Sequence, residues 1–351
     1  MSQRVLSHSR SNAELRGMIS RILPPDLLRS LAAAPDLEGA LRSLLNTVYE
    51  ARVTGLLESG ATIDGAEIML ASELVRAYRR VIGLYRGGKA ALLVQMAKRL
   101  ELDNLKTILR GKVRGEPQDE ISSLLWPLGS LSTLPTQELL LAQDVEAVAA
   151  SLADTEYRRV MQNALPRYIS ERSLFPVEVA LDLHYYRSLW DTLESLSGQD
   201  RSVAGRVMDV RYDLLNIDWI IRYRVIFNLS PEEIYNYTLP YARLIDGETI
   251  RSAASAEGIA GIVAVLPEPY RSLLSGPASL PNPVERSSTA LQRFLVSTAR
   301  SALAGYPFHL GVAVSYLWLK EAEIHDLRLL FEGKRYGAST ETIIDGMWGA
   351  F

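Results

Sequence analysis

The sequence contains no cysteine, and this absence excludes several kinds of site. Without thiols the chain has no disulfide, no cysteine nucleophile and no cysteine-ligated zinc. Histidine is scarce as well: only His8, His184, His309 and His325 occur, and no two of them are four residues apart. We therefore expect no metal site and no cofactor, and the lack of cysteine is compatible with a cytosolic location.

Long apolar runs and an excess of one charge are also missing. The longest strongly apolar stretches, residues 258–266 and 309–319, are about half as long as the roughly 20 residues of a transmembrane helix. The N-terminal residues have no apolar core of the kind found in a signal peptide. Lys and Arg total 38 and Asp and Glu 41, and this balance does not favour a general nucleic-acid binder. We expect a chain that crosses no membrane, although it could lie against one.

The sequence does have a strong helical periodicity. Leu, Ala, Arg and Glu recur at three- and four-residue spacings, and alternating β-branched runs are scarce. Pro24 and Pro25 end the first helical segment, because a proline nitrogen has no hydrogen to donate. Loops are expected at 127–136, 246–249 and 274–285. The expected fold class is all-α, and 351 residues suit two or three domains.

One sequence element occurs twice, about two hundred residues apart. "DNLKTILRGKVRG" spans residues 103–115 and "HDLRLLFEGKRYG" spans 325–337. A shift of 222 positions aligns residues 98–126 with 320–348 without a gap. The identical pairs are Lys98/Lys320, Glu101/Glu323, Leu105/Leu327, Gly111/Gly333, Lys112/Lys334, Gly115/Gly337, Ile121/Ile343 and Trp126/Trp348.

A third copy lies between these two, in "DLLNIDWIIRYRVIFNLSPEEI" at 213–234. A shift of 112 positions places Asn104 on Asn216 and Lys112 on Arg224. The Asn or Asp positions 104, 216 and 326 are therefore 112 and 110 residues apart. The sequence predicts three related units of about that length, far longer than the roughly 20–50 residues of solenoid repeats.

Each copy has the pattern of a long helix with a tight stop. An acidic residue precedes an Asn or Asp by three positions, and apolar residues form a stripe on the same helix. Gly or Asn ends the helix, because these residues best tolerate a left-handed backbone. Ser230, Pro231 and Glu233 then predict a capping box that begins a short returning helix. The repeated structural motif comprises Glu101, Asn104, Leu105, Gly111, Lys112, Gly115, Asp213, Asn216, Ile217, Asn228, Glu323, Asp326, Leu327, Gly333, Lys334 and Gly337.

These copies predict the domain organisation. We expect the polar residues at 104, 216 and 326 to tie helix ends to neighbouring loops. The expected domains are three helical bundle repeats at residues 1–130, 131–245 and 246–351. Three equivalent bundles in one chain suggest a pseudo-threefold body that encloses an axis.

The same residues resemble a known family. "YLWLKEAEIHDLRLLFEGKRYG" resembles the C-terminal signature of the C-subunit family of V-type and A-type ATPases, whose eukaryotic member is called the d subunit. "LDNLKTILRGKVRG" is similar to the first internal copy in that family, "SNAELRGMISRIL" to its N-terminal opening, and "LDLHYYRSLWDTL" to the start of its second unit. The resemblance covers roughly residues 11–351, with the motifs in the family's order. The departures are Glu14 where Arg is usual, no Tyr before Asn12, and Phe227 with Asn228 in place of a Gly.

The resemblance implies a funnel-shaped helical protein on the cytoplasmic face of a membrane, peripheral to it. Its cavity would receive the coiled-coil central shaft and companion stalk subunit of a rotary ATPase, and its other face would rest on the proteolipid ring. Such a central-stalk subunit transmits torque for proton or sodium transport and catalyses nothing. The residues that contact shaft or ring are not identified by the resemblance.

The sequence also contains patterns that resemble the motifs of other functions. "GLYRGGKA" (83–90) nearly spells a phosphate-binding loop, but Ala90 replaces the metal-holding hydroxyl and the preceding stretch is helical, so we expect a helix–helix turn and no nucleotide. The charged run "KEAE" (320–323) is expected on an exposed helix face, and His184 as a buried polar anchor. A generic helical adaptor for another helical partner is the alternative function, followed by an enzyme with a site assembled from distant residues.

Overall fold

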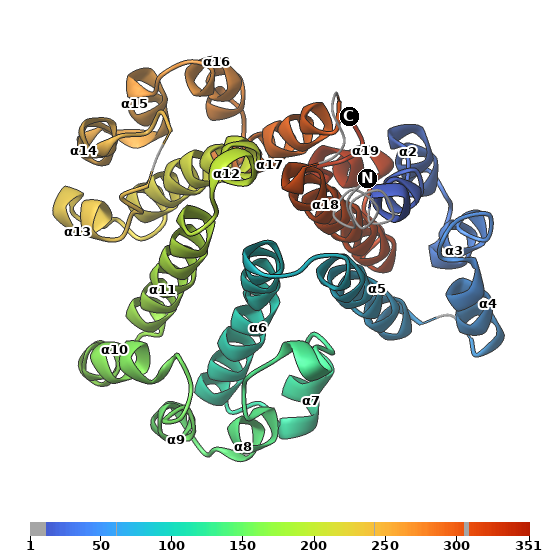
Figure 1. The fold of residues 1–351 in the computed structure, drawn as a ribbon, viewed down its shortest axis with the longest axis horizontal. Helices are drawn as coiled ribbons and strands as arrows, with labels where there is room; N and C mark the ends of the chain where they lie inside the picture. The colour runs from blue at the N-terminus through green and yellow to red at the C-terminus, as the bar shows by residue number, and fades with distance from the viewer. Residues whose placement is uncertain (1–11, 61, 242, 305–308) are drawn as a thin grey trace. The chain divides into compact units, whose positions relative to one another are not determined.

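The computed structural model describes residues 12–60, 62–241, 243–304 and 309–351 (Figure 1). Within these ranges the regular structure is helical and contains no strand, which confirms the expected all-α class. The chain forms two compact units. Unit 1 comprises residues 1–77 and 197–351, and unit 2 comprises residues 78–196. The expected division at 1–130, 131–245 and 246–351, and its pseudo-threefold arrangement, stay predictions.

Unit 2 is built around one long helix. This helix, α6 (Gly88–Arg114), packs against α11 (Phe175–Glu194), and α10 (Arg158–Glu171) packs on α11. Shorter segments complete the unit: α7 (Gln118–Ser123), η1 (Gly129–Leu131), α8 (Thr136–Leu141) and α9 (Val145–Ser151). Of these, α7, η1 and α9 contact α6. The core of unit 2 therefore lies along α6.

Unit 1 contains the two other helices that carry the repeated motif, α12 (Gly198–Val225) and α18 (Leu310–Arg335). Together with α6 these are the three long helices. Helices α12, α18 and α17 (Pro283–Ala302) pack pairwise against one another. Between α12 and α17 the chain forms α13 (Pro231–Asn236), α14 (Gly247–Ser255), α15 (Gly258–Val265), α16 (Tyr270–Ser275) and η2 (Pro277–Ser279).

The N-terminal part of the chain lies against α18, also within unit 1. It contains a helical stretch at 12–19, followed by α2 (Pro25–Ala32), α3 (Leu37–Ser43) and α4 (Glu50–Glu58). Helices α2 and α3 pack on α18, and α2 also contacts α19 (Thr340–Gly346) (Figure 1). Helix α5 (Ile63–Gly83) crosses the boundary between the two units. Segments from both ends of the sequence are thus packed together in unit 1.

The predicted apolar stripes are buried on all three long helices. Their nine residues are at most 2% exposed: Leu102, Leu105, Ile108, Leu214, Ile217, Ile220, Ile324, Leu327 and Leu330. A spacing of three keeps each set on one helix face, and burial of such a side chain contributes about 1.5–3 kcal/mol. The stripes therefore orient each long helix toward its core.

The structure confirms the capping box at Ser230 and the helix–helix turn at 83–90, whereas the expected loop at 246–249 is wrong. The capping box at Ser230 is present, with Glu233 bonded back to the Ser230 N–H. The turn between α5 and α6 follows a helix, not a strand, as expected for "GLYRGGKA". Residues 247–249 are helical, because the Asp246 side chain accepts from the Thr249 N–H and begins α14. The expected loops at 127–136 and 274–285 each contain one 3-10 turn, but their ends are helical, because α8 begins at Thr136, α16 ends at Ser275 and α17 begins at Pro283.

Close packing at Gly333 gives a stability test. A Cβ added to Gly333 on α18 would lie 2.6 Å from an Ile343 side-chain atom, whereas one added to Gly55 on α4 meets nothing within 4 Å. We expect Gly333→Ala to lower the free energy of unfolding by about 1–2 kcal/mol, because overpacking outweighs the gain in helix propensity. The control Gly55→Ala should raise it by about 0.5–1 kcal/mol. Urea denaturation measures both, and equal effects of the two substitutions would contradict the tight contact.

Candidate functional site

The middle of α6 carries a buried carboxylate that holds two other segments of unit 2. Glu101 is fully buried and accepts hydrogen bonds from the Thr133 backbone N–H and from the Tyr157 hydroxyl at 3.0 Å. Three residues later, the Asn104 amide exchanges two bonds with the Trp126 backbone, at 3.0 and 2.7 Å. These side chains fasten the segments after α7 and before α10 onto α6.

Helix α12 in unit 1 carries bonds of the same kinds. Asp213 is fully buried and accepts from the backbone N–H groups of 243–245 at 2.9–3.2 Å and from the Tyr270 hydroxyl at 2.7 Å. Asn216 exchanges two bonds with the Leu239 backbone, at 3.0 and 2.8 Å. The shorter Asp side chain is thus bound mainly by consecutive backbone donors.

Helix α18 repeats the pattern with partners from both ends of the chain. Glu323 accepts from the Leu23 N–H and from the Tyr49 hydroxyl at 2.6 Å. Asp326 replaces the Asn of the other two helices and accepts from the N–H groups of Trp348 and Gly349, both at 2.7 Å. A carboxylate fits here because both partners are donors.

The three tyrosines are held in their neutral form. Burial, reinforced by the negative charge of the bonded carboxylate, raises the pKa of Tyr49, Tyr157 and Tyr270 well above the ordinary value for a phenol. Each hydroxyl therefore remains a proton donor to its carboxylate. Desolvation that keeps a phenol protonated suits a structural tie and not an acid or a nucleophile in catalysis.

The C-terminal ends of the long helices are fixed by a basic side chain. Lys112 donates to the Leu140 carbonyl at 2.6 Å, Arg224 to that of Ala256 at 3.2 Å, and Lys334 to that of Ala32 at 2.6 Å. Past these ends, Gly115, Asn228 and Gly337 adopt positive φ angles of 70°, 49° and 64°. Added Cβ atoms at Gly111 and Gly333 would clash with Ile121 and Ile343, so these glycines allow the returning helix to approach closely.

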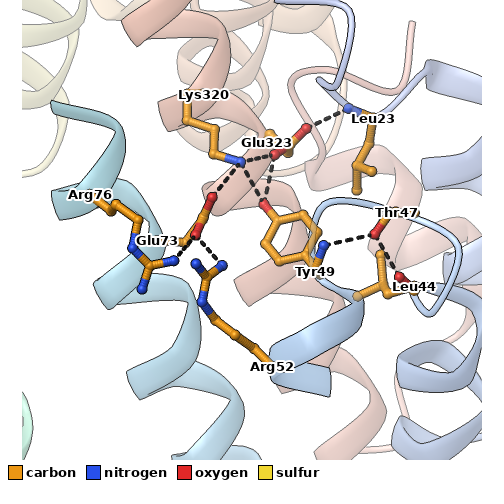
Figure 2. Close-up of polar contacts among 9 residues, drawn as sticks. All are labelled: Leu23, Leu44, Thr47, Tyr49, Arg52, Glu73, Arg76, Lys320 and Glu323. Atoms are coloured by element: carbon orange, nitrogen blue, oxygen red, sulfur yellow. Dashed lines mark hydrogen bonds and ion pairs between the residues drawn. The ribbon is translucent and has the colours of Figure 1, made fainter. Parts of the chain in front are cut away.

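The expectation that "KEAE" lies on an exposed face is wrong, because Lys320, Ala322 and Glu323 are buried. Lys320 is 3% exposed and Glu323 is 2% exposed, and they bond to each other at 2.6 Å (Figure 2). The Lys320 ammonium also donates to the Tyr49 hydroxyl at 3.0 Å and lies 3.8 Å from Glu73. Their identity with Lys98 and Glu101 is the sequence signal that pointed to a structural role, whereas periodicity could not identify Tyr49 and Glu73 as partners.

Unit 2 has a more open cluster at the matching lysine. Lys98 donates a hydrogen bond to Glu156, and His184 Nε2 lies 3.5 Å from the other Glu156 oxygen. The imidazole and the ammonium together lower the pKa of Glu156 from 4.5 to about 2. The expected buried anchor His184 is only half-buried and packs edge-on to Tyr157.

The remaining candidate residues form no metal site or membrane span within the described ranges. His325 stacks on Trp348 with ring centroids 3.5 Å apart, and His8 lies outside the described residues. Among the residues that the structure describes, no group of three or more His, Asp or Glu could hold a metal ion. No described helix is both long and apolar enough to span a bilayer.

The lowered pKa of Glu156 predicts a pH-dependent contribution to stability. A depressed carboxyl pKa stabilises the fold above about 4.5, and this contribution is lost as the pH falls through about 2. At neutral pH, Glu156→Gln should lower the free energy of unfolding by roughly 1–2 kcal/mol, allowing for partial solvent screening. Chemical denaturation at a series of pH values would measure the difference between the two proteins. We expect it to shrink toward pH 2, and a difference that grows on acidification would contradict this assignment.

Comparison with known proteins identifies the family. The model of the ATP synthase (C/AC39) subunit family matches residues 11–345. The C subunit of the A-type ATP synthase of Methanocaldococcus jannaschii is 26% identical over 95% of this chain and 84% of its own length. That of Methanothermobacter thermautotrophicus is 25% identical over 96% and 86%. The C subunit of the V-type ATP synthase of Deinococcus radiodurans is 25% identical over 96% and 90%.

The match extends over almost the whole chain, and the relatives are aligned over most of their own lengths. It agrees with the resemblance that the repeated motif and the chain ends indicated. The relatives are named as subunits of a synthase, in agreement with the expectation of a non-catalytic, structural role. The chain belongs to the ATP synthase (C/AC39) subunit family.

Proposed function

We propose that the protein is a central-stalk subunit of a rotary ATPase of the V or A type. It acts as a socket that receives the coiled-coil shaft and its companion stalk subunit and rests on the membrane proteolipid ring. It catalyses no reaction of its own and transmits torque for proton or sodium transport at the cytoplasmic face of the membrane. The observation that carries this proposal is the family match over residues 11–345.

The buried ties suit a torque-bearing body. A protein that transmits torque must keep its helices from sliding past one another. Each long helix is fixed at its middle by a buried carboxylate and at its end by a basic side chain bonded to a backbone carbonyl. Removing one partner from a buried charged group costs about 3–5 kcal/mol, so such ties resist displacement. This rigidity supports a mechanical function.

The three bundles remain part of the proposal. The shared contacts of α6, α12 and α18 support the division into repeats at 1–130, 131–245 and 246–351. The bonds from Glu323 to Leu23 and Tyr49 add part of the N-terminal region to the third bundle. A pseudo-threefold body about a hollow axis would provide the socket for a coiled coil.

A binding experiment with purified proteins tests the proposed partners. The full chain is immobilised and offered the coiled-coil shaft with its companion stalk protein, and separately the detergent-solubilised ring. We expect both to bind, while a coiled coil of unrelated sequence and equal length does not. Equal binding of the unrelated coiled coil would favour the generic adaptor, and failure of both cognate partners would overturn the proposal.

Reconstitution tests the coupling itself. Vesicles that hold the complex without this protein should show ATP hydrolysis uncoupled from ion uptake, and addition of the chain should restore uptake. The isolated chain should hydrolyse no ATP. Binding to the ring should weaken with added salt, because exposed charges are screened over roughly 8 Å at physiological ionic strength. Ion uptake that is as fast without the protein as with it would contradict a coupling function.

A further inference from the structure

The polar partners of α18 come from a different part of the sequence than those of α6 and α12. Glu101 is bonded to Tyr157, 56 residues later, and Asp213 to Tyr270, 57 residues later. Glu323 is instead bonded to Leu23 and Tyr49, which precede it by 300 and 274 residues. The N-terminal segment thus supplies the hydrogen-bond donors for the buried carboxylate of α18, whereas on α6 and α12 residues later in the sequence supply them.

The N-terminal segment also has the local structure of its counterpart in unit 2. Thr47 bonds its hydroxyl to the Leu44 carbonyl at 2.6 Å and accepts the Tyr49 N–H at 3.2 Å. Thr155 does the same ahead of Tyr157, at 2.8 and 3.3 Å. Aspartates 13 residues before each tyrosine, Asp36 and Asp144, begin the helices α3 and α9. The same type of segment is therefore bound in both units.

Contacts of residues 23–58 with α18 and the residues after it extend from Leu23 to Tyr49. Besides Leu23 and Tyr49, which bond Glu323, the Ala32 carbonyl accepts from Lys334 at 2.6 Å and from Thr340 at 3.3 Å. Arg29 donates to the Ala350 carbonyl. Helices α2 and α3 pack on the same α18. Breaking these contacts would leave the mutual packing of α12, α17 and α18 in place.

Lys320 connects this segment to α5. Its ammonium donates to Tyr49 and Glu323 and lies 3.8 Å from Glu73 on α5 (Figure 2). Arg52, near the start of α4, forms an ion pair with Glu73, and Arg76 bonds the same carboxylate at 3.1 Å. One buried lysine on α18 thus contacts both the segment that precedes α4 and the helix α5.

We propose that residues 23–58 form a strap that Lys320 fastens to α18, and that this strap opens as one cooperative segment before the rest of unit 1 unfolds. Local opening of this kind follows natural units of structure and requires only the contacts across one surface to break. Those contacts include a buried charge cluster, which is destabilising when one partner is missing. The strap is therefore closed while Lys320, Tyr49 and Glu323 are bonded to one another and open when these bonds are broken.

Closure of the strap fixes α5. The chain passes from unit 1 into unit 2 between residues 77 and 78, within α5 and about one turn after Glu73. Opening removes Tyr49 and Arg52 from the cluster and leaves Glu73 with fewer partners. The strap does not rest on the proposed function; in a torque-transmitting protein it would set how firmly α5 is held.

Hydrogen exchange of the full chain tests the strap. Lys320→Met keeps most of the side-chain volume and leaves Glu323 and Glu73 without their ammonium. We expect residues 23–58 to exchange at least about tenfold faster than in the unchanged protein, with α12 unaffected. Lys98→Met is the matched control in unit 2 and should leave residues 23–58 protected. Unchanged exchange in 23–58, or equal acceleration in α12, would overturn the proposal.

An engineered disulfide tests whether holding the strap closed restores its protection from hydrogen exchange. The chain has no cysteine, so Ala32→Cys with Thr340→Cys introduces a single possible disulfide across the strap. Oxidation should restore the protection of 23–58 in the Lys320→Met background, and reduction should abolish it. If the oxidised protein still exchanges as fast as the reduced one, the segment does not open at this surface.

Two milder substitutions cover the case in which Lys320→Met does not fold. Tyr49→Phe removes one donor and keeps the ring, and it should accelerate exchange over the whole of 23–58. Glu73→Gln should accelerate exchange in α5 while 23–58 remains protected, because Tyr49 and Glu323 are still bonded. The reverse pattern, with α5 protected and 23–58 open in Glu73→Gln, would contradict the arrangement.

Discussion

The structure depends on one interaction, a buried carboxylate in the middle of each long helix that accepts a tyrosine O–H and backbone N–H groups. An isolated buried carboxylate is strongly destabilising, and these three are tolerated because every one of them is surrounded by donors. The donors belong to segments outside the long helices, such as those before α10, at 243–245 and before α4. The need to satisfy the carboxylate therefore orders segments that hydrophobic packing alone would hold less firmly.

The three helices meet this need with different chemistry. Asp213 is short and accepts from three consecutive backbone N–H groups, whereas Glu101 and Glu323 each accept from a single one, that of Thr133 or of Leu23. On α18 the buried ammonium of Lys320 joins the carboxylate, and there the partners come from the beginning of the sequence. The Lys320 ammonium also donates to the Tyr49 hydroxyl, so it contributes to a contact between segments hundreds of residues apart.

Membership of the ATP synthase (C/AC39) subunit family agrees with this kind of structure. The three tyrosines with raised pKa values are bonded to buried carboxylates on the long helices, so the raised pKa values reflect structural ties. Ties of this kind give resistance to deformation. That property suits a protein whose proposed role is mechanical.

The sequence by itself determined the all-α class, the buried stripes, the capping box at Ser230 and the family, because each depends on local periodicity, local bonding or motif order. It could place Asn104 and Lys320 on helices, but not name Trp126 or Tyr49 as their partners. It misjudged 247–249 as loop and "KEAE" as exposed, since the Asp246 cap and the burial of Lys320 depend on where side chains point. Only the tertiary structure decided that the segment from Leu23 to Tyr49 packs on α18 and bonds Glu323, because spatial contact between distant segments leaves no periodic signal in one sequence.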